Sequence, residues 1–314
     1  MEKKEIHAVT GAFGYTGKYL AKMLLDKGHE VITLTNSPQR KNSFGDKIKV
    51  FPFNFDKQEE LQKSLQAVKV LYITYWVRFN HKMFQHADAV ENTLKLFVAA
   101  KKAGVERIVY VSISNANKNS LLEYFSGKGK IEEFLMNSNI SYAILRPTVI
   151  FGKEDILINN IAWVLRNLPV FGVYGNGKYK IQPIHVTDMA ELALKEGENK
   201  ENKIIEAIGP ETFEYKELVR TIGEIIGKKR KIWQVSHGFG YFAGKIISML
   251  KSDVTITREE IEGLSSGLLY TEGASAAGKI KLTDWAKENK DTLGKIYANE
   301  LRRRKDRTVD YLEK

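Results

Sequence analysis

The sequence predicts an α/β protein built on a doubly wound parallel sheet, with a smaller C-terminal α+β lobe. Two observations predict this fold. A glycine-rich loop follows the first apolar segment at residue 10, and strand-like and helix-like segments then alternate as far as residue 145. Strands that alternate with helices in this way are joined by right-handed crossovers, which produce a parallel sheet. Such sheets bind ligands at the carboxyl ends of their strands, so the residues that follow each strand are the candidates for function.

The glycine-rich loop runs from Thr10 to Gly17, and its glycines have the spacing G-x-x-G-x-x-G. Gly11 permits a tight turn, Gly14 lets the backbone approach a phosphate, and Gly17 lets the following helix pack closely on the strand. A phosphate then lies on the N–H groups at the positive end of the helix dipole. The loop therefore predicts a dinucleotide-pyrophosphate site made of Thr10, Gly11, Phe13, Gly14, Tyr15, Thr16 and Gly17.

The segments that flank this loop complete a strand-helix-strand unit. Residues 5–10 form a short apolar run without helical period, as expected of a strand that is buried on both faces. Apolar residues then recur at helical spacing from Gly17, and the helix is expected to end at Gly28. A second strand is expected at 31–35. This order favours a nucleotide site over a chance glycine-rich hairpin.

The alternation continues through the N-terminal half. We expect strands at 47–53, 68–75, 107–112 and 142–145, and helices at 57–67, at 127–137 and from Met83 to about Gly104. These elements define a Rossmann domain at residues 1–150, whose sheet is completed by a late strand at 203–208. The remainder, 151–314, is expected to form a smaller substrate-binding lobe with helices at 155–168, 187–195, 214–226 and 291–304 and a loop-like segment at 171–177.

The composition is that of a folded protein and excludes several kinds of site. The 314 residues are 43% apolar and contain no cysteine, so disulfides, thiolate metal sites and a cysteine nucleophile are excluded. The first strand follows closely on Met1 and no apolar run is long enough to span a bilayer, so we expect a cytoplasmic protein. The six histidines show no ligand spacing, and no metal site is expected.

The net charge of +11 raises the question of an anionic partner. Lysines are spread among acids along the whole chain and the only dense basic run is 302–307, so nucleic-acid binding is not expected. A solvated helix end is the simplest explanation of that run, and contact with an anionic membrane surface or an acidic partner is the alternative. The amphipathic stretch from Phe239 to Leu250 indicates core or dimer packing, with peripheral membrane contact as its alternative. A monomer and a homodimer both stay open.

A tyrosine and a lysine that follow the fifth strand have the spacing for proton transfer. Tyr124 and Lys128 are four residues apart, so on a helix they share one face. An ammonium group beside a phenol lowers the phenol pKa from about 10 toward neutrality, which suits proton exchange beside a nicotinamide. Ser112 and Ser114 place hydroxyl groups at the end of the same strand. A surface tyrosine and lysine without catalytic function are the alternative.

These segments together resemble the atypical and extended short-chain dehydrogenases/reductases of the NAD-dependent epimerase/dehydratase superfamily. The resemblance is carried by residues 10–17, by Val-Ser-Ile-Ser at 111–114, by the Tyr-x-x-x-Lys pair at 124–128 and by Leu-Arg-Pro-Thr-Val-Ile-Phe-Gly at 145–152. It covers residues 5 to about 210 well. Within the superfamily, the chain most resembles the branch that includes the nucleotide-binding accessory subunit of mitochondrial complex I.

The resemblance implies roles for individual residues. Ser114 would orient the substrate oxygen, Tyr124 would exchange its proton, and Lys128 would hold the ribose hydroxyls and tune Tyr124. Pro147 and Thr148 would lie against the nicotinamide. The chain departs from the family pattern in the short separation of Ser114 and Tyr124, which are ten positions apart.

The segment after the fourth strand is also unusual for such a protein. Thr74, Tyr75 and Trp76 are expected at the cofactor, where the family often has small residues and a histidine, so bulky aromatic rings would narrow the pocket. Arg78 could offer its guanidinium to a phosphate or to a substrate carboxylate. Pairing of Arg78 with a surface acid is the equally weighted alternative.

The residues after the second strand bear on the choice of cofactor. An acid there would hold the adenosine ribose and repel a 2′-phosphate, but the chain has Asn36, Ser37 and Arg40, followed by Lys41. NADP(H) is therefore favoured over NAD(H) by charge. Asp56, after the third strand, either meets the adenine edge or caps the next helix.

Two functions follow from these residues. The first is an NADP(H)-dependent oxidoreductase or epimerase-like enzyme that acts on a small molecule whose identity the sequence does not specify. The second is a non-catalytic dinucleotide-binding protein, either a redox sensor or an assembly subunit. His185, which precedes an expected helix, is interpreted as structural.

Overall fold

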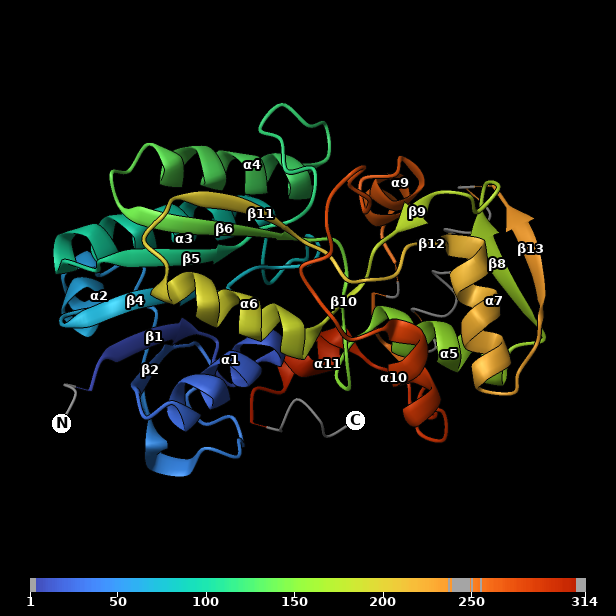
Figure 1. Ribbon diagram of the computed structural model, residues 1–314, viewed down its shortest axis with the longest axis horizontal. Coiled ribbons are helices and arrows are strands. Elements are labelled where there is room, and N and C mark those ends of the chain that lie inside the picture. The colour runs from blue at the N-terminus through green and yellow to red at the C-terminus, as the bar shows by residue number, and fades with distance from the viewer. Residues whose placement is uncertain (1–3, 237, 239–248, 250, 255, 309–314) are drawn as a thin grey trace. The chain divides into compact units, whose positions relative to one another are not determined.

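A computed structural model describes the chain except residues 1–3, 237, 239–248, 250, 255 and 309–314, and it confirms the predicted α/β class. A central seven-stranded sheet has the order β11-β6-β5-β4-β1-β2-β3 (Figure 1). Its strands are β1 (Ile6–Thr10), β2 (Glu30–Leu34), β3 (Ile48–Phe51), β4 (Val68–Ile73), β5 (Arg107–Val111), β6 (Ser141–Pro147) and β11 (Lys203–Ala207). The late strand expected at 203–208 therefore joins the central sheet beside β6.

The strand order reverses between β1 and β4. Helix α1 (Tyr15–Asp26) leads from β1 to β2, and after β3 the chain returns to form β4 on the other side of β1. The pairing is parallel, with Ala8 opposite Leu71 and Val9 opposite Tyr72. A reversal of this kind leaves a crevice at the carboxyl ends of the two strands, where doubly wound proteins bind their ligands.

Helices cover both faces of the sheet (Figure 1). On one face, α3 (His86–Ala103) packs against both α2 (Gln58–Ser64) and α4 (Glu123–Met136), and α1 lies on the other face. A 3₁₀ helix, Gly45–Lys47, precedes β3. The expected end of α3 is confirmed, because Gly104 caps it with a φ of +79°. The core between strands and helices is apolar and includes Leu71, Leu96, Phe97, Ile108, Ile131 and Ile144.

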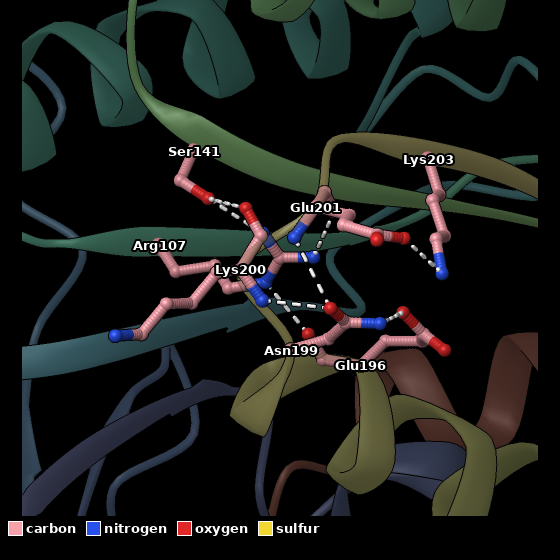
Figure 2. A network of polar contacts seen from close by, with 7 residues as sticks. All are labelled: Arg107, Ser141, Glu196, Asn199, Lys200, Glu201 and Lys203. Carbon is pink, nitrogen blue, oxygen red and sulfur yellow. Dashed lines mark hydrogen bonds and ion pairs between the residues drawn. The ribbon is translucent and has the colours of Figure 1, made fainter.

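A buried arginine secures the β11 edge of the sheet. Arg107, at the start of β5, donates hydrogen bonds to the carbonyl oxygens of Glu196 (2.6 Å) and Glu201 (2.8 Å) and to Ser141 Oγ (2.5 Å), as Figure 2 shows. Asn199 Oδ1 accepts bonds from the next two backbone N–H groups and so turns the chain between those carbonyls. Since each of the three guanidinium nitrogens donates a hydrogen bond, the connection into β11 is fixed by a buried arginine whose nitrogens all have partners.

Contacts divide the chain into two compact units, residues 1–147 with 189–206 and residues 148–188 with 207–314. Helix α6 (Val186–Glu198) runs from the second unit into the first. The described part of the second unit has three two-stranded pairs, β7 (Ile150–Phe151) with β10 (Ile184–His185), β8 (Val170–Tyr174) with β13 (Lys231–Val235), and β9 (Lys180–Ile181) with β12 (Phe213–Glu214). Its helices are α5 (Leu157–Asn167), α7 (Tyr215–Ile225), α9 (Arg258–Ser265), α10 (Leu282–Glu288) and α11 (Glu300–Lys305).

Some predictions for this second unit were wrong. The segment expected as a loop at 171–177 largely forms β8, because β13, which we did not predict, provides its partner. Of the helix expected at 291–304, only the last part forms, as α11, since Gly294 turns with a φ of +71° directly against the backbone of Ala162. Helix α9 was also missed, although Thr257 and Glu260 form a capping box at its start.

The two surface segments that we singled out have different outcomes. In the basic run 302–307, Arg303 is buried and donates to the carbonyl oxygen of Glu154 (2.7 Å), so the run is not simply a solvated helix end. In the amphipathic stretch from Phe239 to Leu250, the apolar residues on which the prediction rests lie outside the described residues. Among the described residues, no helix has the length and apolar character to cross a bilayer.

Candidate functional site

The glycine loop has the geometry that its spacing predicts. Gly11 has a φ of +66°, a left-handed conformation that glycine adopts without strain. A Cβ atom on Gly17 would lie 2.3 Å from the carbonyl oxygen of Gly11, and one on Gly14 would lie 3.1 Å from the same oxygen. Phe13 turns inward and stacks on Phe44, with ring centroids 6.4 Å apart. The loop is therefore a cradle of bare backbone, which fits a pyrophosphate.

The N-terminus of α1 opens onto this cradle. Its N-cap residue is Gly14, and no side chain makes a capping bond there, while Tyr15 and Thr16 begin the first turn. A hydrogen bond to β2 also anchors the loop, because Ala12 N–H donates to Thr33 Oγ1 (3.1 Å) on that strand. An uncapped helix N-terminus beside a glycine turn has free N–H groups suited to a phosphate.

The ends of β1 and β4 are joined at the point where the strand order reverses. Thr10 Oγ1 accepts hydrogen bonds from the backbone N–H groups of Thr74 (2.8 Å) and Tyr75 (3.1 Å). In return, Thr74 Oγ1 donates to the carbonyl oxygen of Thr10 (2.6 Å). Both threonines, expected at the cofactor, thus fix the two strand ends that border the crevice.

The loop after β2 presents polar groups and no acid, as the sequence predicts. Asn36 is exposed and Ser37 is half-buried, with its N–H group bonded to Thr35 Oγ1 (3.0 Å). The side chain of Arg40, however, is only 6% exposed, whereas Lys41 is exposed. Of the two bases considered for a 2′-phosphate, Lys41 is the one at the surface.

Asp56 does not cap the following helix, which was the simpler of its two predicted roles. Helix α2 begins at Gln58, and its N-cap residue is Lys57, without a side-chain capping bond. Asp56 therefore lies one residue too early to cap, and its exposed carboxylate is 3.8 Å from Lys95 Nζ. Contact with the adenine edge stays a prediction.

One of the aromatic residues after β4, Trp76, packs against the helix that carries Tyr124. The rings of Trp76 and His86 are stacked, with centroids 5.7 Å apart and planes within 6°. Tyr124 meets both rings edge to face, at 5.5 and 5.6 Å. Tyr75 points elsewhere and packs on Phe53, at 5.0 Å. Trp76 and His86 thus hold the Tyr124 ring in place.

Lys128 is the most unusual charged group of this region. It lies one turn beyond Tyr124 on α4, is 2% exposed and donates from Nζ to the carbonyl oxygen of Val111 (2.8 Å). The ammonium group also lies over the rings of Trp76 (4.4 Å) and Tyr110 (4.8 Å). Burial lowers the pKa of Lys128 to about 7, against the opposing effect of the Glu132 carboxylate.

The two serines at the end of β5 differ in their surroundings. Ser112 Oγ donates to Glu132 Oε1 (2.5 Å), and the same carboxylate accepts bonds from Arg146 (3.1 and 2.5 Å). The hydroxyl group of Ser112 is therefore engaged in a buried network. Ser114 is fully buried, and its N–H group donates to the carbonyl oxygen of Pro147 (2.9 Å), the last residue of β6.

The remaining predicted residues are placed individually. Thr148 is buried in the second unit, where its hydroxyl group donates to the carbonyl oxygen of Gln182 (2.5 Å). The guanidinium carbon of Arg78 lies 4.9 Å from the Phe79 ring. His185 is buried in β10, and burial lowers its pKa.

Sequence reasoning missed Thr33, His86 and Glu132. Glu132 could have been found, because it is four residues after Lys128 and therefore on the same face of α4. Thr33 is a hydroxyl residue in an apolar strand, which is a weak signal. Nothing local marks His86, since its contacts with Trp76 and Tyr124 depend on the tertiary fold.

Comparison with known sequences finds a family match over most of the N-terminal half. Residues 11–159 match the family described as NAD(P)H-binding. The chain is 27% identical over 232 residues to NADH dehydrogenase [ubiquinone] 1 alpha subcomplex subunit 9 of Arabidopsis thaliana, and 28% identical over 232 residues to the NADH-ubiquinone oxidoreductase 40 kDa subunit of Neurospora crassa, both mitochondrial. The alignments cover 70% and 71% of this chain but only 58% and 60% of those relatives.

A third relative has a different role. The photosystem II assembly factor Ycf39 of Synechocystis is 25% identical over 72% of this chain and 69% of its own length. Among solved structures, the NADPH-dependent quinone oxidoreductase QOR2 of Escherichia coli has a TM-score of 0.71 at 21% identity and covers 90% of this chain and 99% of its own. Triphenylmethane reductase of Citrobacter has a TM-score of 0.70 at 20% identity with the same coverage. These structural likenesses confirm the Rossmann fold.

We expect Gly17→Ala to abolish NADPH binding and to lower the free energy of unfolding by about 1–3 kcal/mol, because the added Cβ would overlap the carbonyl oxygen of Gly11. Gly28→Ala is the matched control at the other end of α1, since its Cβ would meet no atom within 4 Å and only the φ of +85° costs about 1–2 kcal/mol. NADPH fluorescence titration and urea unfolding measure both effects. Equal NADPH affinity in the two variants would contradict the cradle.

The pKa of Lys128 predicts a pH dependence of stability. Between about pH 7 and the ordinary lysine pKa of 10.5, the unfolded chain holds a proton that the folded chain has lost. The free energy of unfolding of the natural chain, relative to Lys128→Met, should therefore rise as the pH increases through this window and level off below it. Urea unfolding of both proteins measures this difference, with Lys130→Met as the exposed control. If the difference in unfolding free energy between the two proteins stayed constant across this pH range, the lowered pKa of Lys128 would be contradicted.

Proposed function

We propose that the protein is an NADP(H)-dependent oxidoreductase or epimerase-like enzyme, because residues 11–159 match an NAD(P)H-binding family and the chain resembles the atypical short-chain dehydrogenases/reductases. The observation that carries this proposal is the buried Lys128 one helical turn from Tyr124. Its pKa is lowered to about 7, and titratable groups with strongly shifted pKa values gather at functional sites. Both residues follow β5, whose carboxyl end belongs to the ligand-binding edge of the sheet.

Each residue of this group has a distinct part in the proposed reaction. A bound nicotinamide supplies or accepts the hydride. The phenol of Tyr124 gives its proton to the substrate oxygen in the reductive direction and takes it back in the oxidative direction. The ammonium form of Lys128 stabilises the phenolate that Tyr124 becomes. The Trp76 and His86 rings orient the phenol and exclude water from its flank.

The preference for NADP(H) is proposed on the loop after β2. Asn36 stands where an acid would repel a 2′-phosphate, and Lys41 offers an exposed positive charge in the same loop. Two structural neighbours were solved with NADPH or NADP(H) bound, which supports this choice.

A second function is favoured by a different observation. Lys128 already donates to Val111 and is covered by two aromatic rings, so its ammonium group is committed to the protein interior. The protein would then bind the dinucleotide without turnover, as a redox sensor or an assembly subunit. The relatives named as a subunit of NADH dehydrogenase [ubiquinone] and as a photosystem II assembly factor support this alternative. A cytoplasmic location stays a prediction, because the names of several relatives describe them as mitochondrial proteins.

Tyr124→Phe separates the two functions. If the protein is an enzyme, we expect this variant to bind NADPH about as tightly as the natural chain but to lose about 100-fold or more in turnover, because the proton donor is gone. NADPH oxidation is followed with a panel of quinones, triphenylmethane dyes and nucleotide sugars. Tyr142→Phe, in β6, is the control. Undiminished turnover by Tyr124→Phe would exclude its proposed role, and NADPH binding without turnover of any substrate by the natural chain would favour the second function.

Asn36→Asp tests the cofactor preference. The added carboxylate repels a 2′-phosphate and accepts hydrogen bonds from a free ribose, so the ratio of NADPH to NADH dissociation constants should rise by about tenfold. Fluorescence titration with each nucleotide measures this ratio. Gln66→Glu adds the same charge at an exposed site before β4 and should leave the ratio unchanged. Similar ratios in both variants would contradict the assignment of this loop.

A further inference from the structure

Three side chains with metal-binding groups meet at the amino end of the sheet, at the opposite end of β1 from the glycine loop. Glu5 precedes β1, His7 lies in β1, and His29 directly precedes β2. Residues two apart in a strand point to the same face. The parallel register, with Ile6 opposite Glu30, then places His29 beside Glu5. One ligand atom from each of the three residues lies within 4.8 Å of the others.

The central ligand is buried and fixed by packing. His7 is 1% exposed, and its ring lies between His29, at a centroid distance of 4.3 Å, and Tyr72, at 5.8 Å. Its Nε2 atom is 3.4 Å from Glu5 Oε2. Its Nδ1 atom is buried and has no hydrogen-bond partner among the described residues. Buried nitrogen atoms without a partner are rare in folded proteins, so this imidazole has coordinating capacity that the protein itself does not use.

We propose that Glu5, His7 and His29 form a binding site for a divalent transition-metal ion of the Zn²⁺ type. Two imidazoles and one carboxylate are ligands that this ion prefers, and such a set leaves a fourth position for water. The spacing of the six histidines in the sequence indicated no metal site, because Glu5 and His7 are far from His29 along the chain. Only the pairing of β1 with β2 brings the three ligands together.

One positive charge competes with the proposed ion. The ammonium group of Lys69 is bonded to the Glu5 carboxylate, and its side chain is 41% exposed. Because the long Lys69 side chain is partly exposed, its ammonium group can move into solvent when an ion takes the carboxylate. We therefore expect removal of this charge to strengthen metal binding. If the ion bound by chance to a surface histidine alone, removal of the charge would leave its affinity unchanged.

Titration of the full chain with Co²⁺, followed by competition with Zn²⁺, tests the site. We expect one equivalent of Co²⁺ to give the visible absorption of a four-coordinate complex, and Zn²⁺ to displace it and raise the Tm. His29→Ala and Glu5→Gln, both at partly exposed positions, should weaken Co²⁺ binding by about tenfold or more. Lys69→Met should tighten binding by about fivefold or more. His81→Ala, a partly exposed histidine outside the cluster, is the matched control.

Three results would overturn the proposal. They are the absence of Co²⁺ and Zn²⁺ binding at micromolar concentrations, equal affinity in His29→Ala and His81→Ala, and unchanged affinity in Lys69→Met. NADPH affinity should be retained in every variant, because these residues lie at the other end of the strands from the glycine loop. The proposal therefore succeeds or fails independently of the dinucleotide function.

Discussion

The contact between Gly17 and the carbonyl oxygen of Gly11 is the constraint on which the rest of the first unit depends. A Cβ at Gly17 would come within 2.3 Å of that oxygen, so α1 can rest on the turn after β1 only if this residue has no side chain. The close packing directs the N-terminus of α1 at the cradle. It also brings β2 back beside β1, because the helix that joins them lies flat against the sheet.

Short hydroxyl side chains then fix the crevice that this packing creates. Thr10 and Thr74 exchange hydrogen bonds across the point where the strand order reverses, and Thr33 holds the glycine loop from β2. These groups satisfy backbone polar atoms that the loops leave without strand partners. Their positions are therefore set by hydrogen bonds to the backbone, which join the strand ends at this edge of the sheet.

The parts of this architecture that depend on local sequence could be predicted. The glycine spacing, the apolar period of α1 and the stop at Gly104 each act within a few residues, and each is confirmed. The pair β8 and β13 was missed because its strands are far apart in sequence. The surroundings of Lys128 show the same limit: its spacing from Tyr124 was readable, but the Val111 carbonyl and the Trp76 ring come from other elements.

The burial of Lys128 is the strongest physical reason to expect chemistry at this site. A lysine whose folded pKa is near 7 destabilises the folded protein at neutral pH, because the unfolded chain keeps the proton more tightly. An apolar side chain of similar length would fill the space between Trp76 and Tyr110 without that cost. Neither the carbonyl of Val111 nor the Glu132 carboxylate offsets the burial fully, since the pKa stays low. A lysine kept here against the stability of the fold is best explained by a task at the ligand-binding edge, one helical turn from Tyr124.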